Sequence, residues 1–529
     1  MNALAQALLA ELPARLSEIP RRWAARTPAA PAVWDGGVRW NYRRLAAAVE
    51  AAEELLVRLD VRPGDRVMIV GENGAALIAL IFALAAADAW AVIVNARLSP
   101  VELENIRAHC GARRAIFTAA ASSSSDAAAH GAHVASERLQ LPLLGDLRVG
   151  PLNTTCTVEP VEAAAQHQVA ALLYTTGTTG HPKGVMLTHR NLLFIAAVST
   201  RLRGLTPDDQ VYGVLPISHV YGLASVMLGT LYAGACLQVV PRFAPSDLID
   251  AIGERGLTVL QGVPAMYARL LEFERGGWSP AGSKLRFIYA GGSPLDLTLK
   301  QRIEALFGLP LHNGYGMTES SPTISQTRLD APRADTSVGS AIPGIETRIV
   351  DLAGNDVPEG EPGELWVRGP NVMKGYYREP ALTAATLRPG DWLNTGDMVR
   401  RDPDGALFVV GRTKEVIIRS GFNVYPVEVE AALNSHPAVS QSAVVGRPAA
   451  DGNEEVVAFV ELDPAQNPSG ESLRQYLAAR LSPYKVPAQI VIMPALPAAA
   501  TGKILKGKLK EYARQIGEDD SEERRIPSP

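Results

Sequence analysis

Helix-like and strand-like hydrophobic patterns alternate through the first half of the chain. Residues 42–59 carry apolar side chains at helical spacing, and residues 65–71 form a short apolar run that ends in glycine. Residues 75–87 again have a helical pattern, and residues 89–95 have the pattern of a buried strand. Buried strands that alternate with helices are typical of a parallel sheet covered by helices. The pattern therefore predicts an α/β fold with layered sheets.

The alternation continues and then changes its character after about residue 340. Residues 241–264 predict a helix followed by a strand, and residues 285–295 predict a strand that ends at glycines. From residue 340 short strands are separated by Gly, Pro and Asp turns, which indicates a small β-rich subdomain. From residue 415 two helices and two strands predict a compact α+β module. The expected units are listed here: an N-terminal domain 1–413 with a β-rich subdomain 340–413, a mobile C-terminal domain 414–512, and a disordered tail 513–529.

Several stretches are expected to carry no chemistry. Residues 119–133 are of low complexity and predict a surface loop or a frayed segment. Residues 75–96 are the most apolar stretch, but Asp88 interrupts them, so we expect a buried helix passing into a buried strand and no membrane span. The N-terminus lacks the pattern of a signal peptide. These features predict a cytoplasmic protein.

Composition narrows the classes of partner. The 529 residues carry a net charge of -4 without a basic stripe, which disfavours nucleic-acid binding. Any bound phosphate should therefore be held by a local site. Cys110, Cys156 and Cys236 are too few and too widely spaced for a disulfide framework or a metal site. We expect buried or partly buried free thiols, as suits a reducing compartment.

The stretch YTTGTTGHPKG, residues 174–184, follows the apolar run 169–173. Glycines let backbone N–H groups approach an anion closely, while threonine hydroxyls and Lys183 add donors and a positive charge. It differs from the common P-loop, because Lys183 stands between Pro182 and Gly184. A flexible Thr/Gly surface loop is the alternative. The composition and the preceding strand favour a polyphosphate-binding loop.

A second candidate stretch is HNGYGMTESSP, residues 312–322. Gly314 and Gly316 flank Tyr315, so the ring stands on a bent backbone and offers a planar base a surface to stack on. Thr318 offers a hydroxyl, and Glu319 offers a carboxylate of the kind that holds Mg²⁺ together with substrate phosphates. A turn with a capping threonine and a solvated glutamate explains the stretch equally well.

Two later stretches complete the set. Asp397 follows a Thr-Gly turn and Arg412 follows a glycine at a strand end, so a carboxylate and a guanidinium from adjacent loops suit the hydroxyls of a ribose. An ordinary surface ion pair is the alternative. Lys503 follows a glycine among small residues, which presents its ammonium on a loop. By itself Lys503 does not differ from the solvated lysines that follow it.

Taken together these stretches resemble one family. YTTGTTGHPKGV, GYGMTE, TGD, GRTKEVIIRSGFNVYPVEVE and TGKILK occur in the order and spacing of the adenylate-forming superfamily of acyl-CoA synthetases, adenylation domains and luciferases. The resemblance extends from about residue 20 to 512, and the combination of motifs is specific although no single motif is. Thr176 departs from the serine usual there, and Ala498 replaces a usual polar or basic residue.

The resemblance implies ATP-dependent activation of a carboxylic acid to an acyl-adenylate, followed by transfer to coenzyme A with release of AMP. It implies that Lys503 acts in adenylation, that Thr318 bonds the α-phosphate, and that Glu319 binds Mg²⁺. It implies that Lys414 is the hinge of the C-terminal domain, and that His219 borders the acyl pocket. A packed core histidine is the alternative for His219. The implied contacts to ATP and coenzyme A involve Thr175, Thr176, Gly177, Thr178, Thr179, Gly180, Lys183, Gly291, Gly292, Ser293, Tyr315, Gly316, Asp397, Arg412, Ser420, Gly421 and Phe422.

The implied acyl pocket is mostly apolar or small, which favours a fatty or aromatic monocarboxylate. Its lining is expected from His219, Val220, Gly222, Val263, Met266, Gly291, Gly314 and Met317. Arg242 or Arg269 would pair the second carboxylate of a malonate-type substrate, but surface arginines with packed stems are preferred. An enzyme that loads a carrier protein and a non-catalytic homologue are further alternatives. No oligomeric state follows from the sequence.

Overall fold

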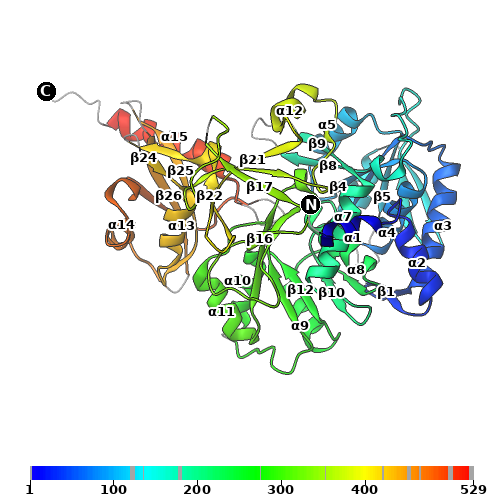
Figure 1. Cartoon of the computed structure of the whole chain (residues 1–529), viewed down its shortest axis with the longest axis horizontal. Coiled ribbons are helices and arrows are strands. Elements are labelled where there is room, and N and C mark those ends of the chain that lie inside the picture. The colour runs from blue at the N-terminus through cyan, green and yellow to red at the C-terminus, as the bar shows by residue number, and fades with distance from the viewer. Residues whose placement is uncertain are drawn as a thin grey trace.

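The computed structural model describes most of the chain as two large sheets, a smaller antiparallel sheet and a C-terminal module (Figure 1). The described residues are 3–118, 125–134, 136–176, 182–274, 276–351, 353–419, 422–449, 454–463, 466–498 and 504–523.

The first sheet has a parallel centre formed by the strands that the hydrophobic runs predicted. β4 (Trp90–Asn95) lies between β3 (Arg66–Gly71) and β8 (Val169–Thr176), and all three run parallel. Antiparallel strands extend the sheet at both ends. Its order is β19 (Gly375–Tyr376), β9 (Pro182–Thr188), β8, β4, β3, β5 (Arg114–Thr118), β7 (Gly145–Val149) and β6 (Glu137–Leu141).

The second sheet also has a parallel centre, from β1 through β14. Its order is β16 (Ser340–Ala341), β15 (Thr323–Gln326), β14 (Leu311–Gly316), β13 (Phe287–Ala290), β12 (Val259–Gly262), β10 (Gln210–Gly213), β11 (Cys236–Val239), β1 (Pro31–Asp35) and β2 (Val38–Asn41). Two predicted strands, those of residues 241–264 and 285–295, are therefore confirmed as β12 and β13.

The two sheets share one hydrophobic core, into which helices pack. In α4 (Ala75–Ala86) every residue from Ala75 to Ala85 is buried, as expected for a helix that is apolar on all sides. This confirms residues 75–96 as a buried helix followed by a buried strand. Among the described residues, no helix is long and apolar enough to cross a bilayer.

The remaining helices of this part of the chain cover the sheets or connect their strands. They are α1 (Ala3–Ala10), α2 (Glu18–Arg26), α3 (Tyr42–Arg58), α5 (Pro100–Cys110), α6 (Ser125–His133), α7 (His189–Leu202), α8 (Gly229–Tyr232), α9 (Pro245–Gly253), α10 (Pro264–Glu274), α11 (Leu297–Phe307) and α12 (Pro380–Thr386). Shorter turns are η1 (Ala165–His167), the π-helix η2 (Tyr221–Leu228) and η3 (Thr318–Ser320).

The low-complexity stretch is more ordered than we expected. Residues 125–133 form α6, where Ala127 is fully buried and the His130 ring bonds the carbonyl of Ala96 over 2.9 Å. Alanine favours helix, and here the buried Ala127 and Gly131 tie the helix to the first sheet. Residues 119–124 lie outside the described part of the chain.

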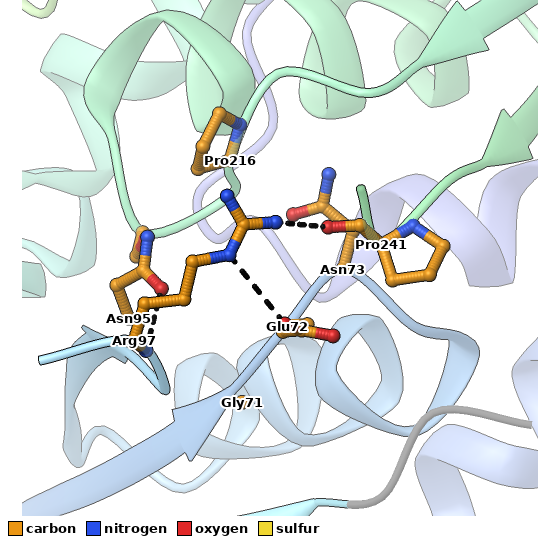
Figure 2. Close-up of a pocket in the computed structure, with 8 residues that line it drawn as sticks. Gly71, Glu72, Asn73, Asn95, Arg97, Pro216 and Pro241 are labelled. Carbon is orange, nitrogen blue, oxygen red and sulfur yellow. Dashed lines mark hydrogen bonds and ion pairs between the residues drawn. The ribbon is translucent and has the colours of Figure 1, made fainter. Parts of the chain in front are cut away.

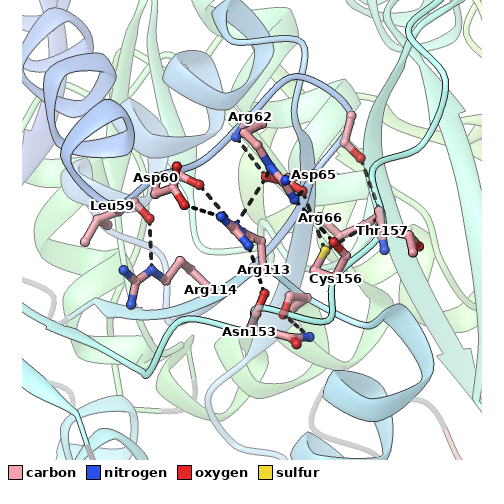
Figure 3. A network of polar contacts seen from close by, with 12 residues as sticks. Leu59, Asp60, Arg62, Asp65, Arg66, Arg113, Arg114, Asn153, Cys156 and Thr157 are labelled. Carbon is pink, nitrogen blue, oxygen red and sulfur yellow. Dashed lines mark hydrogen bonds and ion pairs between the residues drawn. The ribbon is translucent and has the colours of Figure 1, made fainter.

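The three cysteines are free and buried, as predicted. Cys156 lies in a network of charged side chains that joins residues 150–159 to β3 and β5 (Figure 3). The buried Asp65 carboxylate lies 3.2 Å from Arg62 Nε and 3.7 Å from Arg113 Nε, and the Cys156 thiol is 3.6 Å from its other oxygen. Burial raises the pKa of that thiol. The network fixes the outer end of the first sheet.

The β-rich subdomain is a separate antiparallel sheet. Its order is β17 (Glu346–Val350), β18 (Gly363–Arg368), β21 (Trp392–Arg401) and β20 (Leu387–Arg388), with β22 (Leu407–Arg412) paired to β21. The one-turn helix η4 (Thr413–Glu415) follows β22 and leads into the C-terminal module. In Figure 1 this sheet lies between the large sheets and the module.

The C-terminal module has a two-stranded sheet, a three-stranded sheet and its own apolar clusters. Its elements are β23 (Ile417–Arg419), β24 (Phe422–Val424), α13 (Pro426–Asn434), β25 (Val439–Pro448), β26 (Glu454–Leu462), α14 (Gly470–Ala478), η5 (Pro483–Lys485), β27 (Gln489–Met493) and α15 (Lys506–Glu523).

The last helix of this module extends past residue 512, where the module was expected to end. Helix α15 continues to Glu523, and Ala513 is fully buried in a cluster with Phe459 and Leu509. The charged composition of the tail suggested disorder, but the apolar face of its first turns packs on the sheet. Residues 524–529 lie outside the described range.

Candidate active site

The predicted site residues gather where parallel strands end. β13 ends at Ala290, directly before Gly291–Ser293, and β14 ends at Gly316, directly before η3 with Thr318 and Glu319. In open α/β sheets the carboxyl ends of the strands are where ligands bind. Parallel pairing of β13 with β14 thus brings two of the predicted motifs together, although Leu311 follows Ala290 by 21 positions in the sequence.

The predicted phosphate loop connects two antiparallel strands. β8 and β9 pair so that Thr175 faces Lys183 and Thr176 faces Pro182. Lys183 therefore lies on a strand, in agreement with the expectation that it is not within a helix. The centre of the expected loop, Gly177 to Gly180, and the side chain of Thr176 lie outside the described residues.

Tyr376 connects Lys183 to Glu319, and the sequence did not single it out. Its hydroxyl donates to Glu319 Oε1 over 2.7 Å, and the Lys183 Nζ lies 5.6 Å from its ring centroid. Tyr376 reaches this place because β19 pairs with β9, with Tyr376 opposite Val185. Burial raises the pKa of Tyr376, and the neighbouring Glu319 carboxylate raises it further, so the hydroxyl remains a donor. Glu319 is 9% exposed.

Tyr315, Asp397 and Arg412 form a second polar group. The Tyr315 hydroxyl donates to Asp397 Oδ2 over 2.5 Å, and Arg412 Nε lies 3.1 Å from Asp397 Oδ1. The sequence placed Asp397 and Arg412 on adjacent loops; they instead face each other across the paired strands β21 and β22. The Thr-Gly pair before Asp397 had suggested a turn. In the structure Gly396 lies within β21 and has a left-handed backbone. Burial raises the pKa of Tyr315, and the neighbouring Asp397 carboxylate raises it further.

The bent backbone expected around Tyr315 is confirmed, because the β14–β15 register shifts between Tyr315 and Gly316. The flanking glycines are sterically required. A Cβ at Gly314 would lie 1.7 Å from the Tyr289 hydroxyl, and one at Gly316 would lie 1.9 Å from the Pro322 carbonyl oxygen. These contacts hold the tyrosine-bearing strand against its neighbours.

His219 is exposed, so its alternative as a packed core histidine is wrong. Its Nδ1 accepts from the backbone N–H of Tyr221 over 3.3 Å at the start of the π-helix η2. π-Helical turns are frequent at functional sites. Gly222 in this turn allows close approach, because a Cβ there would lie 2.2 Å from the Pro216 carbonyl oxygen.

The expected acyl-pocket residues converge from four elements. Gly291 faces the rings of Tyr221 and Tyr289, and Gly292 has a left-handed backbone beside Val263. The predicted lining divides by exposure into buried Val220, Gly222, Met266, Gly291 and Gly314, partly buried Val263 and Met317, and exposed His219. The structure thus brings η2, β13, β14 and the start of α10 to one place.

The two arginines considered for a second carboxylate lie elsewhere. Arg242 Nε donates to the buried carboxylate of Glu72 over 2.9 Å, and Arg269 is exposed on α10. Figure 2 shows Arg97 reaching the same Glu72 and the Pro241 carbonyl, beside a small cavity that Asn73, Pro216 and Ser218 also line. Both arginines agree with the preferred interpretation as surface side chains.

The residues expected from the C-terminal module are described only in part. Lys414 is exposed in η4, between the subdomain and the module. Phe422 is exposed and stacks on Tyr484 with ring centroids 4.6 Å apart. Ser420, Gly421 and Lys503 lie outside the described residues.

The chain matches family models and curated proteins over most of its length. Residues 20–377 match the family model described as AMP-binding enzyme, and residues 428–503 match that of the AMP-binding enzyme C-terminal domain. A feruloyl-CoA synthase of Amycolatopsis sp. is 36% identical over 499 residues, covering 94% of this chain and 98% of that protein. An indoleacetate–CoA ligase of Aromatoleum aromaticum is 33% identical over 504 residues, with coverage of 94% and 98%.

Solved structures show the same likeness in three dimensions. The crystal structure of ATP-bound MatB from Rhodopseudomonas palustris superposes with a TM-score of 0.83 at 29% identity, over 94% of this chain and 99% of that one.

Proposed function

Because the chain belongs to the family of AMP-binding enzymes, we propose that it activates a carboxylic acid with ATP and transfers the acyl group to coenzyme A. The named relatives are a feruloyl-CoA synthase and an indoleacetate–CoA ligase, and both names describe aromatic acids. An aromatic monocarboxylate is therefore the favoured substrate class, ahead of a fatty acid.

The contact of Tyr376 with both Lys183 and Glu319 carries this proposal. It joins a cation from the phosphate-loop hairpin to a carboxylate that follows β14. A triphosphate needs both a positive side chain and a carboxylate that shares its magnesium ion. The structure brings these two kinds of group to one place from residues far apart in the sequence.

Magnesium fits Glu319 as a single protein ligand. The described residues contain no group of three or more His, Cys, Asp or Glu that would enclose a metal. Mg²⁺ is commonly held by one or two carboxylates together with substrate phosphates. When bound, it would neutralise charge on the phosphates, while Tyr376 holds one oxygen of Glu319 in place.

The chain positions the substrates and supplies no nucleophile. A carboxylate oxygen of the acid attacks the α-phosphorus, the bond to the β-phosphate breaks, and pyrophosphate leaves. The thiol of coenzyme A then attacks the acyl carbon and AMP leaves, while the thiol proton passes to solvent. Thr318 would bond the α-phosphate, and Asp397 with Arg412 would hold the ribose next to Tyr315.

Lys503 and the module that carries it would serve only the first step. In this proposal Lys503 contacts the carboxylate and α-phosphate, and the module then turns about Lys414. The segment 420–422 would then take the place of Lys503 at the active site and line the path of the pantetheine thiol. A separate small domain suits this exchange, because it has its own core and joins the chain through the short η4.

The test is a panel of aromatic and fatty acids scored for pyrophosphate release and for thioester formation, with and without coenzyme A. The expected result is ATP-dependent thioester formation with at least one aromatic acid. Absence of pyrophosphate release with every acid would contradict the proposal. Thioester formation on a carrier protein alone would overturn coenzyme A as acceptor.

The variant Lys503→Ala tests the division of labour, with Lys508→Ala as control because Lys508 is exposed on α15. Lys503→Ala should lose adenylation and keep thioester formation from preformed acyl-adenylate. Equal loss of both half-reactions would argue against the domain movement. Full activity would remove Lys503 from the mechanism.

A further inference from the structure

Arg203 is the most deeply buried charge beside the acyl site. It is 1% exposed, at the C-terminal end of α7. Its Nη1 donates to Gln261 Oε1 over 2.6 Å and to the Ser225 carbonyl over 3.4 Å, and its Nη2 donates to Gln326 Oε1 over 3.5 Å. Every one of these partners is neutral.

No carboxylate pairs with Arg203 in the part of the chain that the structure describes. A buried guanidinium without a counter-ion is costly, and folded proteins pair such charges. The contrast with Arg66 is informative. That buried arginine lies 3.6 Å from Glu159, so the same chain supplies a carboxylate where a charge is purely structural.

Polar atoms around Arg203 also lack partners. Its Nε, the Gln261 Nε2 and the Tyr221 hydroxyl are buried and without a hydrogen bond among the described residues. Such orphans are rare in native proteins and need an explanation. Two of these three atoms are pure donors and the third is a hydroxyl. The cluster therefore complements an acceptor, and its charge favours an anionic one.

The cluster adjoins the expected acyl pocket through two tyrosine rings. The Arg203 guanidinium lies 4.5 Å from the Tyr289 ring centroid, and the Tyr221 and Tyr289 centroids are 6.3 Å apart. A Cβ at Gly291 would lie 3.3 Å from Tyr221 and 3.4 Å from Tyr289, and one at Gly314 would meet the Tyr289 hydroxyl. Both glycines belong to the pocket lining.

Both tyrosine hydroxyls are available as donors. Burial raises the pKa of Tyr221, with a further increase from Tyr289, while the charge of Arg203 opposes the shift. Burial likewise raises the pKa of Tyr289, and the charge of Arg203 again opposes this shift. At neutral pH the two phenols are therefore protonated beside the guanidinium.

We propose that Arg203 is a specificity-determining residue that recognises a hydrogen-bond acceptor on the acyl substrate, at the end remote from the reacting carboxylate. The inference rests on the proposed function and narrows its substrate class to acids with a distal oxygen. On the favoured aromatic monocarboxylate this acceptor is a methoxy or hydroxyl oxygen. A second carboxylate would be a stronger acceptor and would make the substrate a dicarboxylate instead. Arg242 and Arg269 do not compete for this role, because one pairs with Glu72 and the other faces solvent.

The experiment compares benzoates and cinnamates in two sets. The parent acids and their para-methyl derivatives lack a distal acceptor, and the para-methoxy, para-hydroxy and para-carboxy derivatives carry one. For the full-length enzyme, kcat/KM for thioester formation should favour at least one acceptor acid over its para-methyl analogue by about a hundredfold. Ranking of the three acceptors separates an anionic from a neutral group.

Arg203→Met keeps an unbranched, flexible side chain and removes the guanidinium group with its charge and donors. It should raise KM for the preferred acid about a hundredfold and leave kcat/KM for the para-methyl acid within about threefold. Arg269→Met is the matched control and should change neither value. If Arg203→Met fails to fold, Tyr221→Phe removes a single hydroxyl and should lower the same preference by about tenfold.

Two results would overturn the inference and leave the proposed function intact. One is a wild-type enzyme that uses parent and para-methyl acids as well as any acceptor acid. The other is an equal loss for all acids in Arg203→Met, or in Tyr221→Phe where that variant has to be used, as a purely structural role predicts. Absence of thioester with every acid would instead contradict the proposed function itself.

Discussion

The Tyr376 hydroxyl donates to Glu319 Oε1 over 2.7 Å. The donor comes from a two-residue edge strand, and the acceptor comes from a turn 57 positions earlier. The same ring faces Lys183. Tyr376 thus orients Glu319, the expected metal ligand, and borders Lys183, the expected phosphate-binding lysine.

Tyr376→Phe should lower kcat/KM for pyrophosphate release about tenfold and raise the magnesium concentration needed for half-maximal rate. The reason is that a hydrogen bond to a charged group is lost while the ring stays in place. The measurement is a magnesium titration at fixed ATP. Tyr377→Phe is the matched control, because that hydroxyl donates to Glu159 over 2.6 Å. Equal effects of the two variants would contradict the assignment.

Asp397→Asn should weaken ATP binding by about tenfold or more, with a smaller effect on the acid's KM. The substitution keeps the shape of the side chain and removes its negative charge. That carboxylate lies 3.1 Å from Arg412 and accepts a hydrogen bond from Tyr315. Isothermal titration with ATP measures the change. Asp335→Asn is a control, since its carboxylate pairs with Arg333 outside the site. Unchanged ATP affinity in Asp397→Asn would exclude the ribose role.

Gly314→Ala should destabilise the fold by about 1–3 kcal/mol and abolish acid activation, because the new Cβ would overlap the Tyr289 hydroxyl. Thermal unfolding and pyrophosphate release are the two measurements. Gly253→Ala provides the control, as nothing lies within 4 Å of a Cβ there. A stable and active Gly314→Ala enzyme would show that the Tyr289 ring moves freely.

Stability should fall as the pH is lowered from 6.5 to 4. Burial lowers the pKa of His189 to about 4, and burial followed by Lys300 lowers that of His312 to about 4. The unfolded chain titrates near 6.5, so it binds more protons than the folded chain within this window. The contribution of each histidine to the free energy of unfolding is fully present above pH 6.5. It is lost as the pH falls from 6.5 to 4, by about 3 kcal/mol for each histidine.

Urea unfolding of the wild type and of His189→Gln at pH 7, 6 and 5 measures this effect. In the wild type the Leu16 N–H donates to His189 Nδ1, and glutamine retains an acceptor for this N–H. The variant should lose less stability on acidification than the wild type. Parallel pH profiles would show that His189 does not carry the predicted protonation.

Local patterns were sufficient for most elements. The helix at residues 42–59 is α3, and the runs at 65–71 and 89–95 are β3 and β4. Periodicity succeeds here because burial on one side or on all sides leaves a direct mark on neighbouring positions. It failed at α6 and at the extension of α15, where few apolar residues pack against a distant sheet.

The site divides in the same way. Motifs with glycine, threonine and a charged residue at short spacing marked Lys183, Glu319, Asp397 and Arg412. The sequence suggested that Asp397 and Arg412 act together, but only strand pairing places them opposite each other. Tyr376 and Arg203 carry no local signal, since a tyrosine beside glycine and an arginine at a helix end are common.

The sequence by itself determined the order of helices and strands, the family resemblance and the residues with chemical potential. These are properties of short segments, where side-chain spacing and backbone preference act directly. The tertiary structure decided which of those residues meet and which buried charge lacks a partner. Tyr376 reaches Glu319 through an edge strand, and Arg203, which caps the C-terminal end of α7, lies against Tyr289 of β13. Contacts across such distances arise from cooperative packing of the whole core, which no local pattern records.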